Sequence, residues 1–596
     1  MSISHTQLRE QFAQFWKQKE HVLVPPSPLV LKEDPTTLFN SSGMQPLVPF
    51  LLGETHALGK RLYNIQPCIR TQDIEEVGNN RHTTFFEMMG NWSLDDYFKE
   101  EQHSWCWEFY TKIIGLPKDK LYVTVFEGGA GVPKDEESIA IWKKLGVAED
   151  HIRAYGADKN WWSRSGPPEK MPVGEIGGPD SEIFYEFENV QHDKKFGETC
   201  HPNCDCGRFM EFANSVFIQY RKKEDGSLEE LSQKNVDFGG GLERLSCAAN
   251  NQPDVFKTDI FTQIIRAIEE VSQKPYEENK QTMRIIADHV RASVFLTKNG
   301  VYPSNKEHGY VLRKFLRRAC VKMRSLNGSF NKEAFSMIAR AVLSTYGNKF
   351  FDITTDEITI SKVVDEEIKK FVKSLDLGMK ELSKYQTIDG KIAFDLYQSF
   401  GFPLEVTEEL LKEKGKTINH DDFEKEFNKH KELSRSASTG MFTGGLADQG
   451  EQTIKYHTAT HLLHQALYDV LGQEVRQEGS NITTERLRFD FQSTTKPTDE
   501  QVKKIETTIN EKINASLPVS FKILPKEEAL KVGAKSFFRE KYPERVKVYF
   551  IGNSLETAYS KEFCGGPHVA NTKEIGKITI YKTEKIGSNL YRIYAK

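Results

Sequence analysis

Two pairs of side chains in the last quarter of the sequence have the types and spacing of metal ligands. His457 and His461 are four residues apart, which places both imidazoles on one face of a helix, and Cys564 and His568 follow far downstream. One thiolate and three imidazoles suit tetrahedral Zn²⁺ or a related divalent metal. A metalloprotease would need Glu beside the first histidine, where this chain has Thr. We predict a zinc site at these four residues; ordinary core histidines are the alternative, and His464 is a weaker ligand candidate.

A second group of soft ligands is more compact. Cys200, His201, Cys204 and Cys206 lie within seven residues, and such a group in a reduced compartment indicates a small structural zinc site. Two adjacent residues bind one ion awkwardly, so His192, close upstream, is the alternative fourth ligand. Reduced free thiols in a loop are the other interpretation.

A third group lies in the first 250 residues and combines arginines with glycine-rich turns. Arg244 follows three glycines, and a helix that begins there would present it where the helix dipole favours an anion. Any one of these segments alone is more simply an ion pair or a turn. The segments that carry the signal together are 68–73, 81–91, 160–162, 174–182 and 236–244.

In this order, the segments resemble motifs 2 and 3 of the class II aminoacyl-tRNA synthetases. Four more segments narrow the resemblance to the alanyl-tRNA synthetase family: Leu38–Met44, Thr83–Asn91, Ile285–Arg291 and Pro303–Arg313. The resemblance covers most of the chain. It implies an antiparallel-sheet catalytic domain that activates alanine with ATP, with Mg²⁺ bridging the phosphates, and transfers it to the 3′ end of tRNA-Ala.

The resemblance also implies roles for individual residues. Arg70 would hold the α-phosphate and the substrate carboxylate, and Arg244 the folded-back triphosphate, because planar guanidinium groups suit both tasks. Asp237 would bind the alanine ammonium. Glu87 would contact the adenine or its neighbourhood, or equally would stabilise the fold. The other substrate-binding candidates are Met88, Trp162, Asn214 and Val216.

A basic helix is the candidate tRNA contact. Lys306–Arg324 holds seven basic residues against one acid, and those from Arg313 onward fall within about half of the helix circumference. Such a stripe is typical of phosphate-backbone binding, with a solvated surface helix as the alternative. In the family an Asn and an Asp read a G·U wobble pair; Asn305 matches the first, and uncharged Gln398 aligns with the second. The predicted tRNA-binding residues are Asn305, Arg313, Lys314, Arg317, Arg318 and Gln398.

The zinc motif in turn resembles the editing domain of alanyl- and threonyl-tRNA synthetases, in which Gln477 would contact the substrate end. A pocket for alanine rejects glycine or serine by only about 1–3 kcal/mol, so a second site must hydrolyse mischarged Ser-tRNA and Gly-tRNA. The sequence departs from the family at Pro567, where Thr is usual, and has only a Gly-rich stretch where a β-barrel segment is usual. It ends at Lys596 without the family's usual C-terminal domain, and we expect a monomer.

The elements that must position these residues indicate an α+β multidomain protein. Strand-like runs lie at 121–126, 487–491 and 577–581, and helical patterns at 260–271, 283–295 and 453–471. We predict a catalytic domain at 1–250, a helical tRNA-recognition domain at 251–435, a Gly-rich linker at 436–452 and an α+β editing domain at 453–596.

Composition narrows the class of protein. The net charge of −4, from 81 basic and 85 acidic residues, argues neither for nor against nucleic acid. The sequence has no 18-residue apolar run and no signal peptide, and its eight cysteines are too few for a disulfide framework, so we expect a cytoplasmic protein. Two rival functions are a hydrolase that only deacylates mischarged tRNA and a non-catalytic tRNA-binding protein. Only the ligase needs alanine and ATP.

Overall fold

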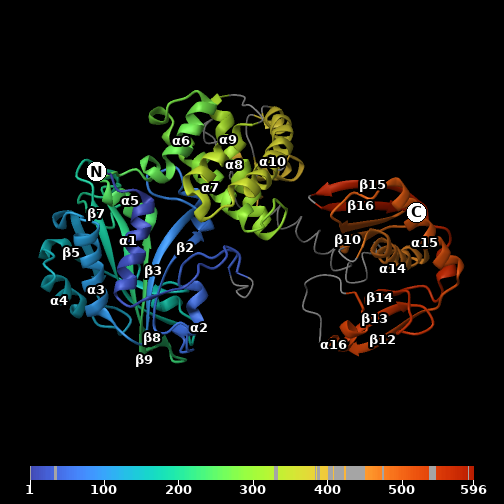
Figure 1. The fold of residues 1–596 in the computed structure, drawn as a ribbon, viewed down its shortest axis with the longest axis horizontal. Coiled ribbons are helices and arrows are strands. Elements are labelled where there is room, and N and C mark those ends of the chain that lie inside the picture. Colours follow the sequence, from blue (N-terminus) through green and yellow to red (C-terminus); the bar gives the residue numbers. More distant parts are fainter. Residues whose placement is uncertain are drawn as a thin grey trace. The chain divides into compact units, whose positions relative to one another are not determined.

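The computed structural model describes residues 2–31, 37–327, 333–382, 384–385, 389–400, 407–408, 422–423, 450–472, 475–535, 545–587 and 589–596. They belong to two compact units, drawn in Figure 1. The first unit comprises residues 1–388 and 392–418, and the second comprises 389–391 and 419–596. The first unit carries the predicted catalytic residues and the cysteine-rich group, and the second carries the predicted zinc site of the editing domain.

A large, mostly antiparallel sheet forms the centre of the first unit. Its strand order is β1-β2-β3-β9-β8-β7-β4-β5, with β6 paired to β7; only the β1–β2 and β4–β5 pairs are parallel. At Gly178 a Cβ would come within 1.8 Å of the Phe217 carbonyl oxygen, so only glycine fits where β7 crosses β8. The strands are β1 (Val22–Leu23), β2 (Arg61–Ile69), β3 (Phe85–Leu94), β4 (Leu121–Phe126), β5 (Ile152–Tyr155), β6 (Trp161–Ser163), β7 (Ile176–Glu186), β8 (Phe209–Lys222) and β9 (Leu228–Gly241).

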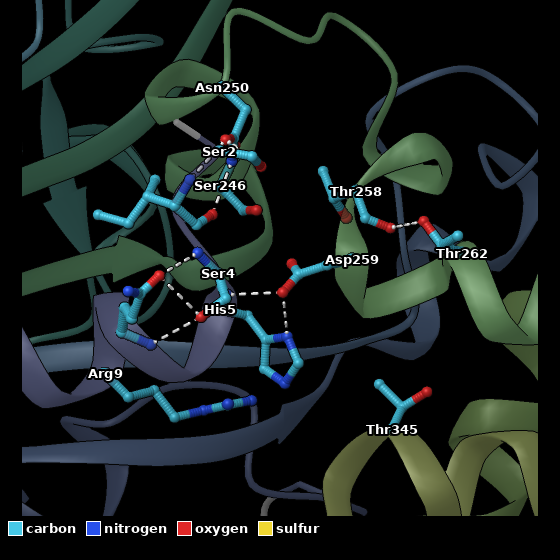
Figure 2. Close-up of polar contacts among 12 residues, drawn as sticks. Ser2, Ser4, His5, Arg9, Ser246, Asn250, Thr258, Asp259, Thr262 and Thr345 are labelled. Carbon is cyan, nitrogen blue, oxygen red and sulfur yellow. Dashed lines mark hydrogen bonds and ion pairs between the residues drawn. The ribbon is translucent and has the colours of Figure 1, made fainter.

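Helix α1 (His5–Gln18) covers the sheet and is fixed at its first turn (Figure 2). Ser4 caps it in a capping box with Gln7. Asn250, just after α5 (Leu242–Ala249), accepts hydrogen bonds from Ser2 Oγ at 2.8 Å and from the Ile3 amide. Asp259 accepts from both the amide and Nδ1 of His5. The other helices on this part are α2 (Val48–Leu51), α3 (Lys99–Glu108) and α4 (Glu136–Lys144).

A bundle of helices completes the first unit. Helices α7 and α8 pack along one another, and α7 also contacts β3, so the bundle is continuous with the sheet behind the predicted catalytic residues. Its helices are α6 (Asp259–Ser272), α7 (Lys280–Lys298), α8 (Glu307–Asn327), α9 (Ala334–Tyr346), α10 (Ile353–Leu382) and α11 (Gly390–Phe400).

The second unit wraps two small antiparallel sheets around one long helix. Strands β10 (Arg476–Ile482), β11 (Leu487–Gln492), β16 (Leu590–Ala595) and β15 (Ile580–Gly587) form one sheet, and β12 (Val519–Pro525), β13 (Arg545–Ile551) and β14 (Ser560–Phe563) form the other. Helix α14 (Glu451–Leu471) is buried along much of its length and shares an apolar core with β11 and α15 (Asp499–Asn514). A short helix, α16 (Lys526–Lys531), precedes β13.

The α+β multidomain class is confirmed, and the elements predicted from periodicity are present. Residues 121–126 form β4, and the helix predicted over 453–471 is α14, which ends before Gly472 at φ 109°. The strand predicted over 577–581 begins only at Ile580. The predicted Gly-rich linker at 436–452 lies outside the described residues, apart from its last three. This is also the stretch where a β-barrel segment is usual in the family. Among the helices that the structure describes, none is long and apolar enough to cross a membrane.

Candidate functional site

A cavity of about 590 Å³ in the first unit gathers the residues predicted for catalysis; we call it the first-unit cavity. Its walls come from the end of β2, from β3, β6, β8 and β9, and from the first turn of α5. The predicted residues that line it are Arg70, Met88, Trp162, Asn214, Val216, Asp237 and Arg244.

Two guanidinium groups give the cavity a positive side. Arg70 immediately follows β2; its Nε donates to the Ser41 carbonyl at 3.2 Å, and its guanidinium lies 4.8 Å from the ring centre of Phe86. Arg244 donates to the carboxylate of Glu211 at 2.9 Å and to its carbonyl at 3.1 Å. Both side chains are therefore held in place before any anion binds, which lowers the entropic cost of binding one.

Buried carboxyl groups on another wall of the cavity can bind a cation. Burial raises the pKa of Asp237 to about 7, although Trp92 Nε1 donates to it at 2.7 Å. Behind the wall of the cavity, burial likewise raises the pKa of Asp180 to about 7, and the lining residue Asn214 hydrogen-bonds to it. A bound cation favours the charged form of such groups, so the site is tuned to accept one.

Asn214 adds an unmatched acceptor. Within the described part of the chain its Oδ1 is buried and has no hydrogen-bond partner. A buried acceptor without a donor is costly, so this atom indicates a ligand with N–H or O–H groups beside Asp237.

Glu87 does not reach the first-unit cavity, and its predicted contact with substrate is wrong. Alternate residues of a strand face opposite sides, so Met88 lines the cavity while Glu87 is fully buried behind it. Glu87 forms a bidentate ion pair with Arg9. Its backbone amide donates to Glu243, and the Glu243 carboxylate forms an ion pair with Arg291. The alternative, that Glu87 stabilises the fold, agrees with these contacts.

The second unit brings together His457, His461, Cys564 and His568, which we call the second-unit cluster. Their candidate ligand atoms all lie within 4.8 Å of one another, in the part of the chain that the structure describes. Cys564 Sγ is 3.4 Å from the Nε2 atoms of both His457 and His568. Burial lowers the pKa of His457 to about 3, so its imidazole is neutral, as a metal ligand must be.

Atoms outside the second-unit cluster orient its rings. His457 Nδ1 donates to the Pro567 carbonyl at 3.0 Å, which leaves Nε2 with its lone pair facing Cys564. Thr458 Oγ1 lies 3.2 Å from His568 Nδ1. Thr458, which excludes a metalloprotease, and Pro567, where the sequence departs from the family, thus both contact rings of the cluster.

Glu562 is a site residue that the sequence reasoning missed. Burial alone would raise the pKa of Glu562, but His461, His464 and Lys535 lower it to about 2. Its carboxylate lies 3.6 Å from His461 Nε2 and 2.9 Å from His464 Nδ1. Glu562 is two residues before Cys564 at the end of β14, and this spacing on a strand was the available signal. His464 thus joins the cluster through Glu562 and not as a ligand.

Gln477, predicted to contact the editing substrate, is half-buried on β10. It pairs with Phe491 of β11 at a bulge between Gln477 and Gly479. The bulge interrupts the regular strand there, a common way of redirecting a side chain.

The basic helix is not the open stripe that the sequence predicts. Arg318 is buried and donates to the Ile74 carbonyl, so its predicted contact with tRNA is wrong. Arg317 donates to Glu367 at 2.9 Å, and Lys314 lies 3.6 Å from Glu75. Helical periodicity could not show that acids on other elements face this stripe.

Among the candidates whose side chains the structure describes, Asn305 is the exposed one. It accepts a hydrogen bond from Arg313, which also lies 3.3 Å from Glu367. Gln398 belongs to α11, and its side chain lies outside the described residues.

The four soft ligands of the first unit are His192, Cys200, Cys204 and Cys206, which we call the loop cluster. His201 is not among them: its Nδ1 lies 3.0 Å from the Tyr155 hydroxyl. The side chain that converges with the three cysteines is thus that of His192, the alternative fourth ligand, and the metal site itself stays a prediction.

Comparisons with known proteins agree with this arrangement. The family model described as "tRNA synthetases class II (A)" matches residues 7–502, and "Threonyl and Alanyl tRNA synthetase second additional domain" matches residues 546–594. The alanine–tRNA ligase of Treponema denticola is 44% identical over all of this chain and 99% of its own length. The alanine–tRNA ligase of Borreliella afzelii is 42% identical over 99% of this chain and 98% of its own. That of Thermotoga maritima is 34% identical over all of this chain and 80% of its own.

Proposed function

The chain belongs to the alanyl-tRNA synthetase family of class II synthetases, as its motifs predicted, and on that premise we propose how its residues divide the work of an alanine–tRNA ligase between two sites. The first-unit cavity activates alanine with ATP and charges tRNA-Ala. The second-unit cluster hydrolyses mischarged Ser-tRNA and Gly-tRNA. Monomeric state and cytoplasmic location stay predictions.

The observation that carries the first role is the pairing of opposite charges across one cavity. Asp237 and the unmatched Asn214 oxygen accept the alanine ammonium, which leaves the alanine carboxylate on the side of Arg70. The carboxylate oxygen attacks the α-phosphorus, the bond to the β-phosphate oxygen breaks, and pyrophosphate leaves. Arg70 neutralises charge that develops at phosphorus, and Arg244 holds the departing phosphates.

The cavity also has donors that fit Mg²⁺. Glu182 and Glu211 both line it, and carboxylate oxygens are the ligands that this ion prefers. Bound Mg²⁺ would neutralise charge on the triphosphate. Glu211 also accepts a hydrogen bond from Arg244. The same carboxylate would therefore hold the Mg²⁺ ion and orient the guanidinium toward the triphosphate.

The alanine pocket is small because bulky residues close it. Val216 and Trp162 line the cavity, and Val216 pairs with Asp237 across β8 and β9. A methyl group fits this space, but glycine is only one methyl smaller and is rejected by about 1–3 kcal/mol. This limited discrimination is the reason for a second site.

The second-unit cluster has a donor set that fits Zn²⁺: three neutral imidazoles and one thiol that loses its proton on binding. Bound zinc would supply a Lewis acid for hydrolysis of the aminoacyl ester. The chain's own contribution is orientation and charge: the Pro567 carbonyl accepts from His457 Nδ1, and the Glu562 carboxylate, hydrogen-bonded to His464, lies 3.6 Å from His461. Gln477 is proposed to contact the mischarged substrate end.

For tRNA, we propose that exposed Asn305 contacts the acceptor stem and that Arg313 positions it. Lys314 and Arg317 would add less positive potential at the surface, because Glu75 and Glu367 partly neutralise their charges. The G·U contact of Gln398 stays a prediction.

Amino-acid-dependent ATP–pyrophosphate exchange, measured with the purified full chain, tests this assignment. Exchange should be strongest with alanine and weaker with serine and glycine. In a His461→Ala variant exchange should persist while Ser-tRNA hydrolysis is lost. No exchange with any amino acid, from folded protein with Mg²⁺, would overturn the ligase assignment and leave the deacylase.

A further inference from the structure

The loop cluster is a second candidate metal site, in a part of the chain that the ligase and editing roles do not use. The ligand atoms of its four residues lie within 4.8 Å of one another. Cys200 Sγ is 3.5 Å from Cys206 Sγ, and Cys204 Sγ is 3.6 Å from His192 Nδ1. These separations are close to the edges of a tetrahedron whose centre is about 2.0–2.3 Å from each ligand atom.

The ring of His192 is already set for such a role. Its Nε2 donates to the Gly197 carbonyl at 2.7 Å, so Nδ1, the atom that faces the cysteines, keeps its lone pair. A carbonyl that fixes the tautomer in this way is the usual second contact of a metal-binding histidine.

The loop around the cluster has little else to hold its shape. Between β7 and β8, residues 193–199 are all exposed, including Phe196. Small segments that bury no apolar core commonly depend on a metal or disulfides for their fold. All three cysteines of the cluster are free thiols in this structure.

The cluster is linked to the first-unit cavity through one residue. Asp205, between ligands Cys204 and Cys206, accepts from Arg81 at 2.7 Å. Arg81 lines the cavity, and only 13% of its side chain is exposed, whereas Asp205 is 74% exposed. An exposed aspartate holds an ion pair weakly unless its backbone is fixed, and two flanking ligands on one ion would fix it.

We propose that His192, Cys200, Cys204 and Cys206 hold a structural Zn²⁺ ion, which fixes Asp205 and thereby positions Arg81 at the wall of the first-unit cavity. On binding, each of the three thiols releases its proton to solvent. Three thiolates and one imidazole close all four positions, so the ion is structural and not hydrolytic. Arg81 is thus a fixed positive group near the phosphates, and Asp205 is a positioning residue; this second part rests on the proposed ligase function.

Metal content tests the site independently of any activity. The wild-type chain should hold about two zinc atoms, and Cys204→Ser should hold about one fewer. His201→Ala is the matched control, because His201 neighbours Cys200 but lies outside the ligand set; it should keep both atoms. An unchanged count in Cys204→Ser, or loss of an atom in His201→Ala, would overturn the proposal.

Cobalt substitution covers the case in which Cys204→Ser fails to fold. In a Cys564→Ser background, which removes the thiol of the second-unit cluster, Co²⁺ should still give the intense thiolate-to-metal charge-transfer absorption of a tetrahedral three-thiolate site. Absence of that band in folded protein would refute the site.

Kinetics test the link to Arg81. Asp205→Ala should keep its zinc yet raise the KM for ATP about tenfold, as should Arg81→Ala, with kcat less affected. The double variant should be no worse than Arg81→Ala, because the two residues act through one contact. An unchanged KM in Asp205→Ala would refute the positioning role while the metal count still stands, and wild-type protein without exchange would refute only the ligase premise.

Discussion

The first-unit cavity and the second-unit cluster obtain their reactive groups in different ways. The cavity is lined by fixed side chains of positive and negative charge, such as Arg70 and Asp237, which pair with charged groups of the substrates. In the cluster, neutral imidazoles and a buried thiol, raised by burial to a pKa of about 12, need a metal to do chemistry. The first site therefore supplies its charged groups from its own side chains. The second supplies only metal ligands, and the metal supplies the reactive charge.

The loop cluster refines this comparison. Both clusters have four candidate Cys and His ligands. One has two imidazoles on α14 and a third in the segment after β14, and the other has three thiols on a loop. The first is held by the fold and orients the metal for reaction. The second holds the fold around Arg81.

The largest expected effect separates the two sites outright. Arg244→Ala should lower alanine-dependent pyrophosphate exchange about a thousandfold, because the departing phosphates lose their fixed charge. Hydrolysis of Ser-tRNA should stay at the wild-type rate. Arg340→Ala, which removes an exposed arginine paired with Glu357, is the matched control. Loss of both activities in folded Arg244→Ala protein would show that the sites are not independent.

A smaller effect is expected from the carboxylate behind the zinc ligands. Glu562→Gln should lower Ser-tRNA hydrolysis about 10–100-fold and weaken zinc retention against a chelator, because His461 loses the group that orients it. Glu500→Gln changes an exposed glutamate in the first turn of α15, in the same unit, and should have no effect. Normal zinc retention and hydrolysis in Glu562→Gln would contradict the orienting role.

The pH dependence of alanine binding tests the charged side of the first-unit cavity. Burial raises the pKa of Asp237 to about 7, so the carboxyl takes up a proton as the pH falls through that value. A neutral carboxyl cannot pair with an ammonium, and the KM for alanine should rise about fivefold between pH 7 and pH 6. The KM for ATP, measured in the same exchange assay, serves as the internal reference. A flat profile for alanine would argue against Asp237 as the ammonium partner.

The smallest effect on either activity is expected at Glu87. Glu87→Gln should leave both KM values within about twofold of wild type, since this side chain faces away from the cavity. It should lower the free energy of unfolding by about 3 kcal/mol, because Arg9 is left as a buried, uncompensated charge. Denaturant unfolding measures the second effect. A large rise in the KM for ATP with unchanged stability would restore the substrate contact that the structure rejects.

Local sequence patterns were enough to predict the residue types that the chemistry requires and the helices and strands that carry them. His457 and His461 were placed on one helical face by their spacing, and the ordered motifs identified the family. Such inferences hold because helix and strand periodicity is local and because a metal or a phosphate restricts the residue types that bind it.

Which of those side chains lie in contact depends on how the helices and strands pack. Glu87 and Met88 are neighbours in sequence, yet the sheet turns one to Arg9 and the other to the cavity. Helical periodicity includes Arg318 in a basic stripe, but in the structure its guanidinium is buried and donates to the Ile74 carbonyl. His192 replaced His201 in the loop cluster because loop geometry follows no period. Partners distant in the chain set burial and pairing, and no local pattern in one sequence encodes them.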